Sequence, residues 1–95
     1  MKKTRTPIIL CAGKNGRCLV YGYVDAEPVP TQPVRLRDAR MVIYYPDGGT
    51  FGLAAKGPPE NSRVTHAIPE TVETVWQEWL AVTPEAAERF DGWEE

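Results

Sequence analysis

The pattern of apolar and polar residues near the amino terminus predicts a β-hairpin. Two apolar runs, residues 8–12 and 18–24, flank the polar segment 13–17. The Asn15-Gly16 pair in that segment favours a two-residue type I′ turn, because both residues tolerate a positive φ. This turn pairs Ala12 with Leu19 and fixes which side chains share a face. One face then carries Ile9, Cys11, Cys18 and Val20, and the other carries Ile8, Leu10, Leu19, Tyr21 and Tyr23.

Both faces of this predicted hairpin are apolar, although a small sheet usually leaves one face to water. We therefore expect the hairpin to be wrapped inside a barrel or covered by another subunit, and the second alternative predicts a homo-oligomer. In the expected register Cys11 and Cys18 lie diagonally on one face, too far apart for an easy disulfide. We predict two buried free thiols, whereas a four-residue turn would pair the cysteines directly.

The middle of the chain predicts two further strands and a short helix. A proline-rich connection, residues 25–33, leads to a short alternating strand at 34–37. Asp38-Ala39 is expected to be a turn, and residues 40–45 a second strand that stops at Pro46. A glycine-rich turn then precedes one or two turns of helix that end at Gly57.

The last third of the chain contains one ambiguous segment. Residues 63–68 are expected to form a strand that ends at Pro69. In residues 71–82 the apolar positions follow helical spacing, but the same residues are rich in Val, Thr and Trp, which favour strands. Thr83-Pro84-Glu85 supplies an N-cap, a first-turn proline and an acid, so a helix is expected from Pro84 to about Phe90.

Together these elements predict a β-rich α+β fold: five or six short strands in a curled antiparallel sheet or partly open barrel, with one or two short helices. The 95 residues suffice for one modest core. We expect a flexible basic arm at residues 1–6, a globular domain at 7–92 and an acidic tail at 93–95. No apolar run is long enough to cross a bilayer, and the cytoplasm is the expected location.

The net charge of −2 hides a strong asymmetry along the chain. Residues 1–40 hold eight bases and three acids, a net charge of +5, whereas residues 41–95 hold three bases and ten acids, a net charge of −7. Such a division can drive association between copies, can present one charged face to a partner, or can be solvated surface. The acidic total argues against a general nucleic-acid binder.

The residue types needed for catalysis or metal binding do not occur in recognisable patterns. His66 is the single histidine, and no second histidine or nearby cysteine stands at a metal-ligand spacing. No serine or cysteine lies in a nucleophile motif, so a Cys-His pair assembled by the fold is the remaining catalytic alternative. We predict no metal, no cofactor and no enzymatic activity.

Five segments of the second half form a recognisable series: 39–45, 51–58, 62–64, 68–70 and 78–86. In order and spacing they resemble a family of small uncharacterised domains encoded by phages and prophages, so the resemblance covers roughly residues 39–86. It implies that 77–82 form a strand, and it brings no catalytic residues. The context it implies is that of small phage proteins that act by binding, as anti-CRISPR inhibitors do.

Three non-enzymatic functions follow from this resemblance and from the charges. The first is a counter-defence inhibitor that binds a host defence protein through an acidic face made of Glu70, Glu73, Glu78, Glu85 and Glu88. The second is an oligomeric sponge for a nucleotide second messenger, with a ligand site made of Arg35, Arg37, Arg40, Tyr44 and Tyr45. The third is a phage structural or assembly protein.

Overall fold

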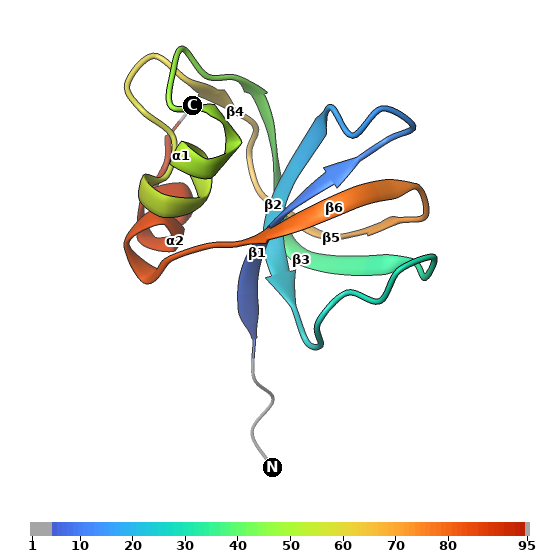
Figure 1. The fold of residues 1–95 in the computed structure, drawn as a ribbon. Helices are drawn as coiled ribbons and strands as arrows, with labels where there is room; N and C mark the ends of the chain where they lie inside the picture. The colour runs from blue at the N-terminus through green and yellow to red at the C-terminus, as the bar shows by residue number, and fades with distance from the viewer. Residues whose placement is uncertain (1–4, 95) are drawn as a thin grey trace.

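A computed structural model describes residues 5–94 and shows six antiparallel strands and two helices (Figure 1). In chain order the elements are β1 (Thr6–Ala12), β2 (Cys18–Val24), β3 (Val34–Tyr44), α1 (Gly49–Lys56), β4 (Arg63–Val64), β5 (Ile68–Glu73), β6 (Trp76–Ala81) and α2 (Pro84–Asp91). The prediction of a β-rich α+β domain is confirmed.

The β1–β2 hairpin forms, but its register differs from the predicted one. Ala12 pairs with Cys18 rather than with Leu19, because the loop contains five residues instead of two central ones. Gly13 and Gly16 adopt positive φ, Asn15 does not, and the Asn15 side chain accepts a hydrogen bond from the Arg17 N–H at 3.2 Å. The predicted type I′ turn is therefore wrong, and the one-residue slip exchanges the faces of β2.

Strand β3 is a single long strand where the sequence predicted two strands joined by a turn. Asp38 interrupts it with a φ of 52°, and the pairing with β2 shifts there, from Arg40 opposite Tyr21 to Arg37 opposite Tyr23. This irregularity is a β-bulge, which bends a strand without ending it. The predicted turn at Asp38-Ala39 is thus a bulge. Strand β3 pairs with β5 from Val34 to Ala39, across the bulge, and with β4 at Val42 and Tyr44.

The sheet is open, with the strand order β4-β3-β2-β1-β6 and with β5 also paired to β3. No pairing joins β5 to β6 within residues 5–94, so the strands do not close. The expected curling toward a partly open barrel is corrected to an open, uncurled sheet. Figure 1 shows β5 and β6 on the side of the molecule away from the two helices.

The ambiguous segment 71–82 is extended, as its Val, Thr and Trp content favoured. Residues 68–73 form β5 on β3, and residues 76–81 form β6 on β1, so the helical spacing was misleading. The strand expected at 63–68 is also shorter, since β4 holds only Arg63 and Val64 and Ile68 already belongs to β5. Pairing with two different strands decides the conformation of this segment against its local periodicity.

Two apolar cores lie on the two faces of the β1–β2 hairpin. The helix-side core joins the hairpin to both helices, through Ile9, Cys11, Leu19, Tyr21, Val42, Leu53, Ala54, Val64, Val82, Ala86, Ala87 and Phe90. The second core contains Ile8, Leu10, Ala12, Val20, Val24, Val34, Leu36 and Ala39, with Trp76 and Trp79 packed against it. One copy of the chain therefore covers both hairpin faces, which removes that reason for expecting a homo-oligomer; the oligomeric state itself stays a prediction.

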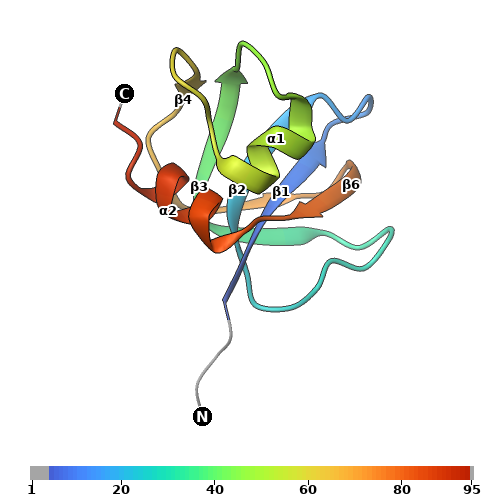
Figure 2. The ribbon, with the colours of Figure 1, turned by 60° about the vertical axis from the view of Figure 1, so that its left-hand side comes forward.

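Helix α2 spans the predicted residues and α1 ends before Gly57 as predicted, but α1 already begins at Gly49, within the expected glycine-rich turn. Gly57, with a φ of 85°, ends α1, and its N–H donates to the Leu53 carbonyl. The Thr83 hydroxyl oxygen caps α2 by accepting from the Ala86 N–H at 3.1 Å, and the same hydroxyl donates to the Ala55 carbonyl at 2.7 Å. Thr83 thus fixes the start of α2 against the end of α1, and Figure 2 shows the two helices side by side on one face of the sheet.

The ends of the expected domain lie at the limits of the described residues. Most of the predicted arm, residues 1–4, and Glu95 of the predicted tail lie outside them. Arg5 forms an ion pair with Asp38 at 2.7 Å, and Thr6 already pairs with Val24 in β1. Neither helix is long and apolar enough to cross a bilayer.

Candidate functional site

The three candidate arginines leave β3 on the same side but bind different partners. Arg35 forms an ion pair with Glu70 at 3.4 Å, and Arg37 forms one with Asp25 at 3.1 Å. The Arg40 Nη1 donates to the main-chain carbonyl of Trp93 at 3.0 Å. Because the bulge at Asp38 separates Arg37 from Arg40 along β3, the three guanidinium groups do not share one ligand-sized hollow.

The two candidate tyrosines that follow them also separate. Tyr44 is exposed at the end of β3, opposite Arg63 of β4. Tyr45 is half-buried and packs against the helix-side core. The arginines and tyrosines proposed for a nucleotide site therefore occupy several separate environments rather than one pocket.

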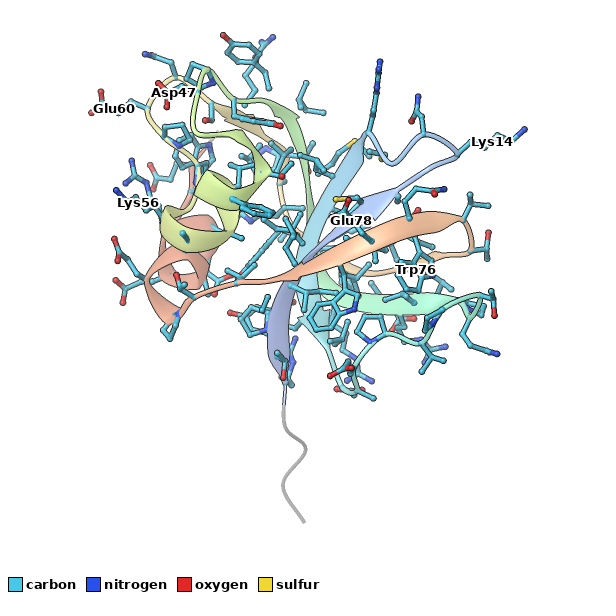
Figure 3. All side chains as sticks on the ribbon, in the orientation of Figure 1. Lys14, Asp47, Lys56, Glu60, Trp76 and Glu78 are labelled. Carbon is cyan, nitrogen blue, oxygen red and sulfur yellow. The ribbon has the colours of Figure 1, made fainter. Side chains whose placement is uncertain are left out.

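The five candidate glutamates form two groups on different sides of the molecule. Glu70 and Glu73 belong to β5 and Glu78 to β6, whereas Glu85 and Glu88 belong to α2. Glu70 is paired with Arg35, and Glu73 accepts a hydrogen bond from the Thr71 hydroxyl at 2.8 Å. Figure 3 shows Glu78 and Trp76 on opposite sides of β6. The acids of β5 and α2 therefore belong to separate surfaces.

A polar network that was not predicted from the sequence holds α2 against the sheet. Both carboxylate oxygens of Asp91 accept hydrogen bonds, from the Tyr21 hydroxyl at 2.9 Å and from the Tyr23 hydroxyl at 2.5 Å. Burial, and then the hydrogen bonds to its neighbours, raise the pKa of Tyr21 well above its ordinary value. The Tyr21 ring stacks on Phe90 at 4.2 Å between centroids. The signal in the sequence was the spacing of Tyr21 and Tyr23 two positions apart in β2, because such residues share one face.

A polar hollow of about 480 Å³ lies beside this network. Its lining is Arg5, Tyr23, Asp38, Arg40, Ala67 and Asp91. The two carboxylates are already occupied, Asp38 by Arg5 and Asp91 by the two tyrosines. The Arg5 guanidinium also lies 5.0 Å from the centroid of the Tyr23 ring. These contacts connect Arg5, which directly precedes β1, with β2, β3 and α2, so this cluster serves the fold.

A larger hollow, about 700 Å³, opens on the outer side of α2. It is lined by Glu85, Glu88, Arg89, Gly92, Trp93 and Glu94, and we call it the acidic hollow. Within residues 5–94 neither Glu85 nor Glu88 forms an ion pair. Three carboxylates and one guanidinium leave this surface with a net negative charge.

Trp93 occupies a fixed position in the wall of the acidic hollow. The main-chain N–H of Trp93 donates to the Phe90 carbonyl at 3.1 Å, and the main-chain carbonyl of Trp93 accepts from Arg40 at 3.0 Å. The indole ring is half-buried against the helix-side core, and the indole Nε1–H makes no hydrogen bond within the described residues. Trp93 therefore presents an ordered aromatic ring with an unused donor, a combination common at protein interfaces.

The thiols and carboxylates offer little for covalent or metal chemistry. Cys11 and Cys18 are both free, as predicted, but only Cys11 is buried, whereas Cys18 is half-buried. Burial raises the pKa of both thiols, so the reactive thiolate form is scarce at neutral pH. In the part of the chain that the structure describes, no three His, Cys, Asp or Glu side chains are grouped to hold a metal ion.

Comparison with known proteins gives one family-level result. A family model matches residues 6–90, which is nearly the whole chain. No curated protein and no solved structure matches it.

Proposed function

Because this chain belongs to the family described as a domain of unknown function (DUF6948), we propose its function from its own surface: it is a non-enzymatic counter-defence protein that binds a host defence protein through the outer side of α2. Membership of an uncharacterised family agrees with the resemblance noted above, and the phage origin is part of the proposal. The partner surface is basic, and the acidic hollow around Trp93 is the contact region.

The observation that carries this proposal is the pairing of unneutralised carboxylates with an ordered aromatic ring. Glu85 and Glu88 lack ion partners in residues 5–94, and the main chain of Trp93 is held at both its N–H and its carbonyl. Charged groups around a protein interface mainly steer association and select the partner, while an aromatic residue at its centre supplies contact energy.

This proposal is narrower than the acidic face expected from the sequence. Glu70 and Glu73 lie on β5, where Glu70 forms an ion pair with Arg35 and Glu73 accepts a hydrogen bond from Thr71. Glu78 lies on β6, where it pairs with Cys11 of β1. We therefore assign the binding role to Glu85 and Glu88, together with Glu94. The dispersed positions of Arg35, Arg37 and Arg40 give the nucleotide-sponge alternative no comparable support.

The test is phage growth on a panel of bacterial hosts that each carry one defence system. The chain is produced in each host, and the efficiency of plaquing is compared with that of the same host without the chain. We expect plaquing to rise in at least one host. An efficiency that stays unchanged in every host would overturn the counter-defence role.

A matched pair of charge reversals then locates the contact region. Glu88→Lys changes a carboxylate of the acidic hollow, and Glu27→Lys makes the same charge change in the exposed loop between β2 and β3. We expect Glu88→Lys to abolish the protection of phage and Glu27→Lys to retain it. Equal protection by both variants would remove the acidic hollow from the proposal.

A further inference from the structure

A second hollow adjoins the acidic hollow across Trp93. Its volume is about 440 Å³, and its lining is Ile43, Ser62, Arg63, Val64, Trp93 and Glu94. Trp93 and Glu94 belong to both hollows, so the indole lies in a wall that the two share. Ile43 is 57% exposed and provides apolar surface in this hollow. We call this the edge hollow.

The edge hollow lies at the end of the sheet. β4 is the last strand in the order β4-β3-β2-β1-β6, so within residues 5–94 no strand pairs with its outer edge. Trp93 and Glu94 line the edge hollow together with Arg63 and Val64 of β4, so residues that follow α2 lie near this strand. An unpaired strand edge accepts an added strand, because its main-chain N–H and C=O groups already have the required spacing.

The two hollows differ in charge. In the acidic hollow Glu85, Glu88 and Glu94 outnumber Arg89, whereas in the edge hollow Glu94 is balanced by Arg63 beside two aliphatic side chains. The Ser62 hydroxyl oxygen is buried there without a hydrogen-bond partner in the described residues. A ligand that fits both hollows therefore has an apolar part at β4 and a cationic part at α2.

We propose that an extended segment of the partner protein docks along β4 and across Trp93, with an apolar side chain in the edge hollow and an arginine or lysine in the acidic hollow. This inference rests on the proposed function and specifies its partner. Alternate residues of an extended chain share one side and are about 6.5 Å apart, so the recognised pattern is an apolar residue, any residue, then a base. The Trp93 ring attracts the cation through its face.

The direct test is a titration of the protein with synthetic peptides, followed by NMR. The probe is a capped peptide with valine and arginine at alternate positions and serine between them; the comparison peptide has glutamate in place of arginine. The chain contains three tryptophans, and Trp93→Phe identifies which indole N–H resonance belongs to Trp93. We expect the arginine peptide to shift this resonance saturably, and the shift to weaken as salt is added.

Two variants with exposed side chains locate the peptide on the surface. Ile43→Asp alters the edge hollow, and Glu88→Lys alters the acidic hollow. Each is expected to weaken binding of the arginine peptide about tenfold, while Glu27→Lys binds it as the unchanged chain does. An unmoved Trp93 resonance, or equal binding of the glutamate peptide, would overturn the inference.

Failure of the proposed docking mode and failure of the proposed counter-defence role give different results in these experiments. If the counter-defence role fails, phage plaquing stays unchanged while the arginine peptide still binds at Trp93. If the docking mode fails, the chain still protects phage, and Ile43→Asp protects as well as the unchanged chain. These two patterns cannot be confused with each other.

Discussion

The two sides of α2 differ in what they contribute to the protein. The inner side carries Ala86, Ala87 and Phe90, all buried in the helix-side core. The outer side carries Glu85 and Glu88, which are exposed and have no ion partner in residues 5–94. Because of the helical repeat, the residues of α2 that stabilise the fold lie on one side and the residues proposed to bind the partner lie on the other. Substitutions on the two sides are therefore expected to have different consequences.

The largest effect is expected on the inner side, from Phe90→Ala. Phe90 is fully buried and stacks on Tyr21, so its truncation leaves a cavity between α2 and β2. We expect the free energy of unfolding to fall by about 3–5 kcal/mol, measured by urea denaturation. A loss close to that of a surface substitution would show that α2 does not depend on this contact.

A smaller loss of stability is expected from Gly57→Ala, where α1 meets α2. Gly57 has a φ of 85°, and an added Cβ would lie 2.9 Å from the Arg89 Cβ. Both the backbone conformation and this contact oppose a side chain, so we expect a loss of about 1–3 kcal/mol in urea denaturation. Gly52→Ala is the control, because a Cβ at that helical position meets no atom within 4 Å. An equal effect of the two substitutions would contradict the proposed contact.

Tyr21→Phe removes the hydroxyl that donates to Asp91 while keeping the ring on Phe90. We expect a loss of about 1–2 kcal/mol near neutral pH. The raised pKa of Tyr21 also makes stability depend on pH. The folded state keeps this proton while unfolded chains release it above their ordinary pKa of 10.0, so stability falls as pH rises past that value.

The Tyr21→Phe variant should lose stability less steeply in this alkaline range than the unchanged chain. The measurement is the midpoint of urea unfolding from neutral pH to above pH 10.0. Parallel curves for the two proteins would mean that Tyr21 does not titrate as its burial implies.

The smallest effect on stability is expected on the outer side, from Glu88→Lys. The residue is exposed near the end of α2, where a positive charge suits the helix dipole. The free energy of unfolding should change by no more than about 0.5 kcal/mol, although the same change is expected to abolish the protection of phage. Circular dichroism during thermal unfolding checks this expectation, and a clear drop in Tm would show that the outer side also supports the fold.

Local signals predicted the helices better than they predicted the strand register. Thr83-Pro84 and Gly57 act within a few residues of their own positions, so the start of α2 and the end of α1 could be read from the sequence. The hairpin loop could not, because Gly13 and Gly16 both adopt positive φ and lengthen a turn that Asn15-Gly16 alone would have closed in two residues. Strand pairing with distant segments likewise overrode the helical spacing in residues 71–82.

The candidate site could be predicted only in part for a related reason. Glu85 and Glu88 were identifiable, since a capped helix fixes which side its acids occupy. Trp93 was not, because its place depends on a hydrogen bond from Arg40, more than fifty residues earlier. The bulge at Asp38, which separates Arg37 from Arg40 along β3, has no sequence signal beyond the tolerance of aspartate for positive φ.

One preparation of the Glu88→Lys variant tests the central claim most directly. Its midpoint of urea unfolding and its protection of phage are measured beside those of the unchanged chain and of Glu27→Lys. We predict an unchanged midpoint with protection lost in Glu88→Lys alone. Protection retained at an unchanged midpoint would contradict the claim that the outer side of α2 is the binding surface.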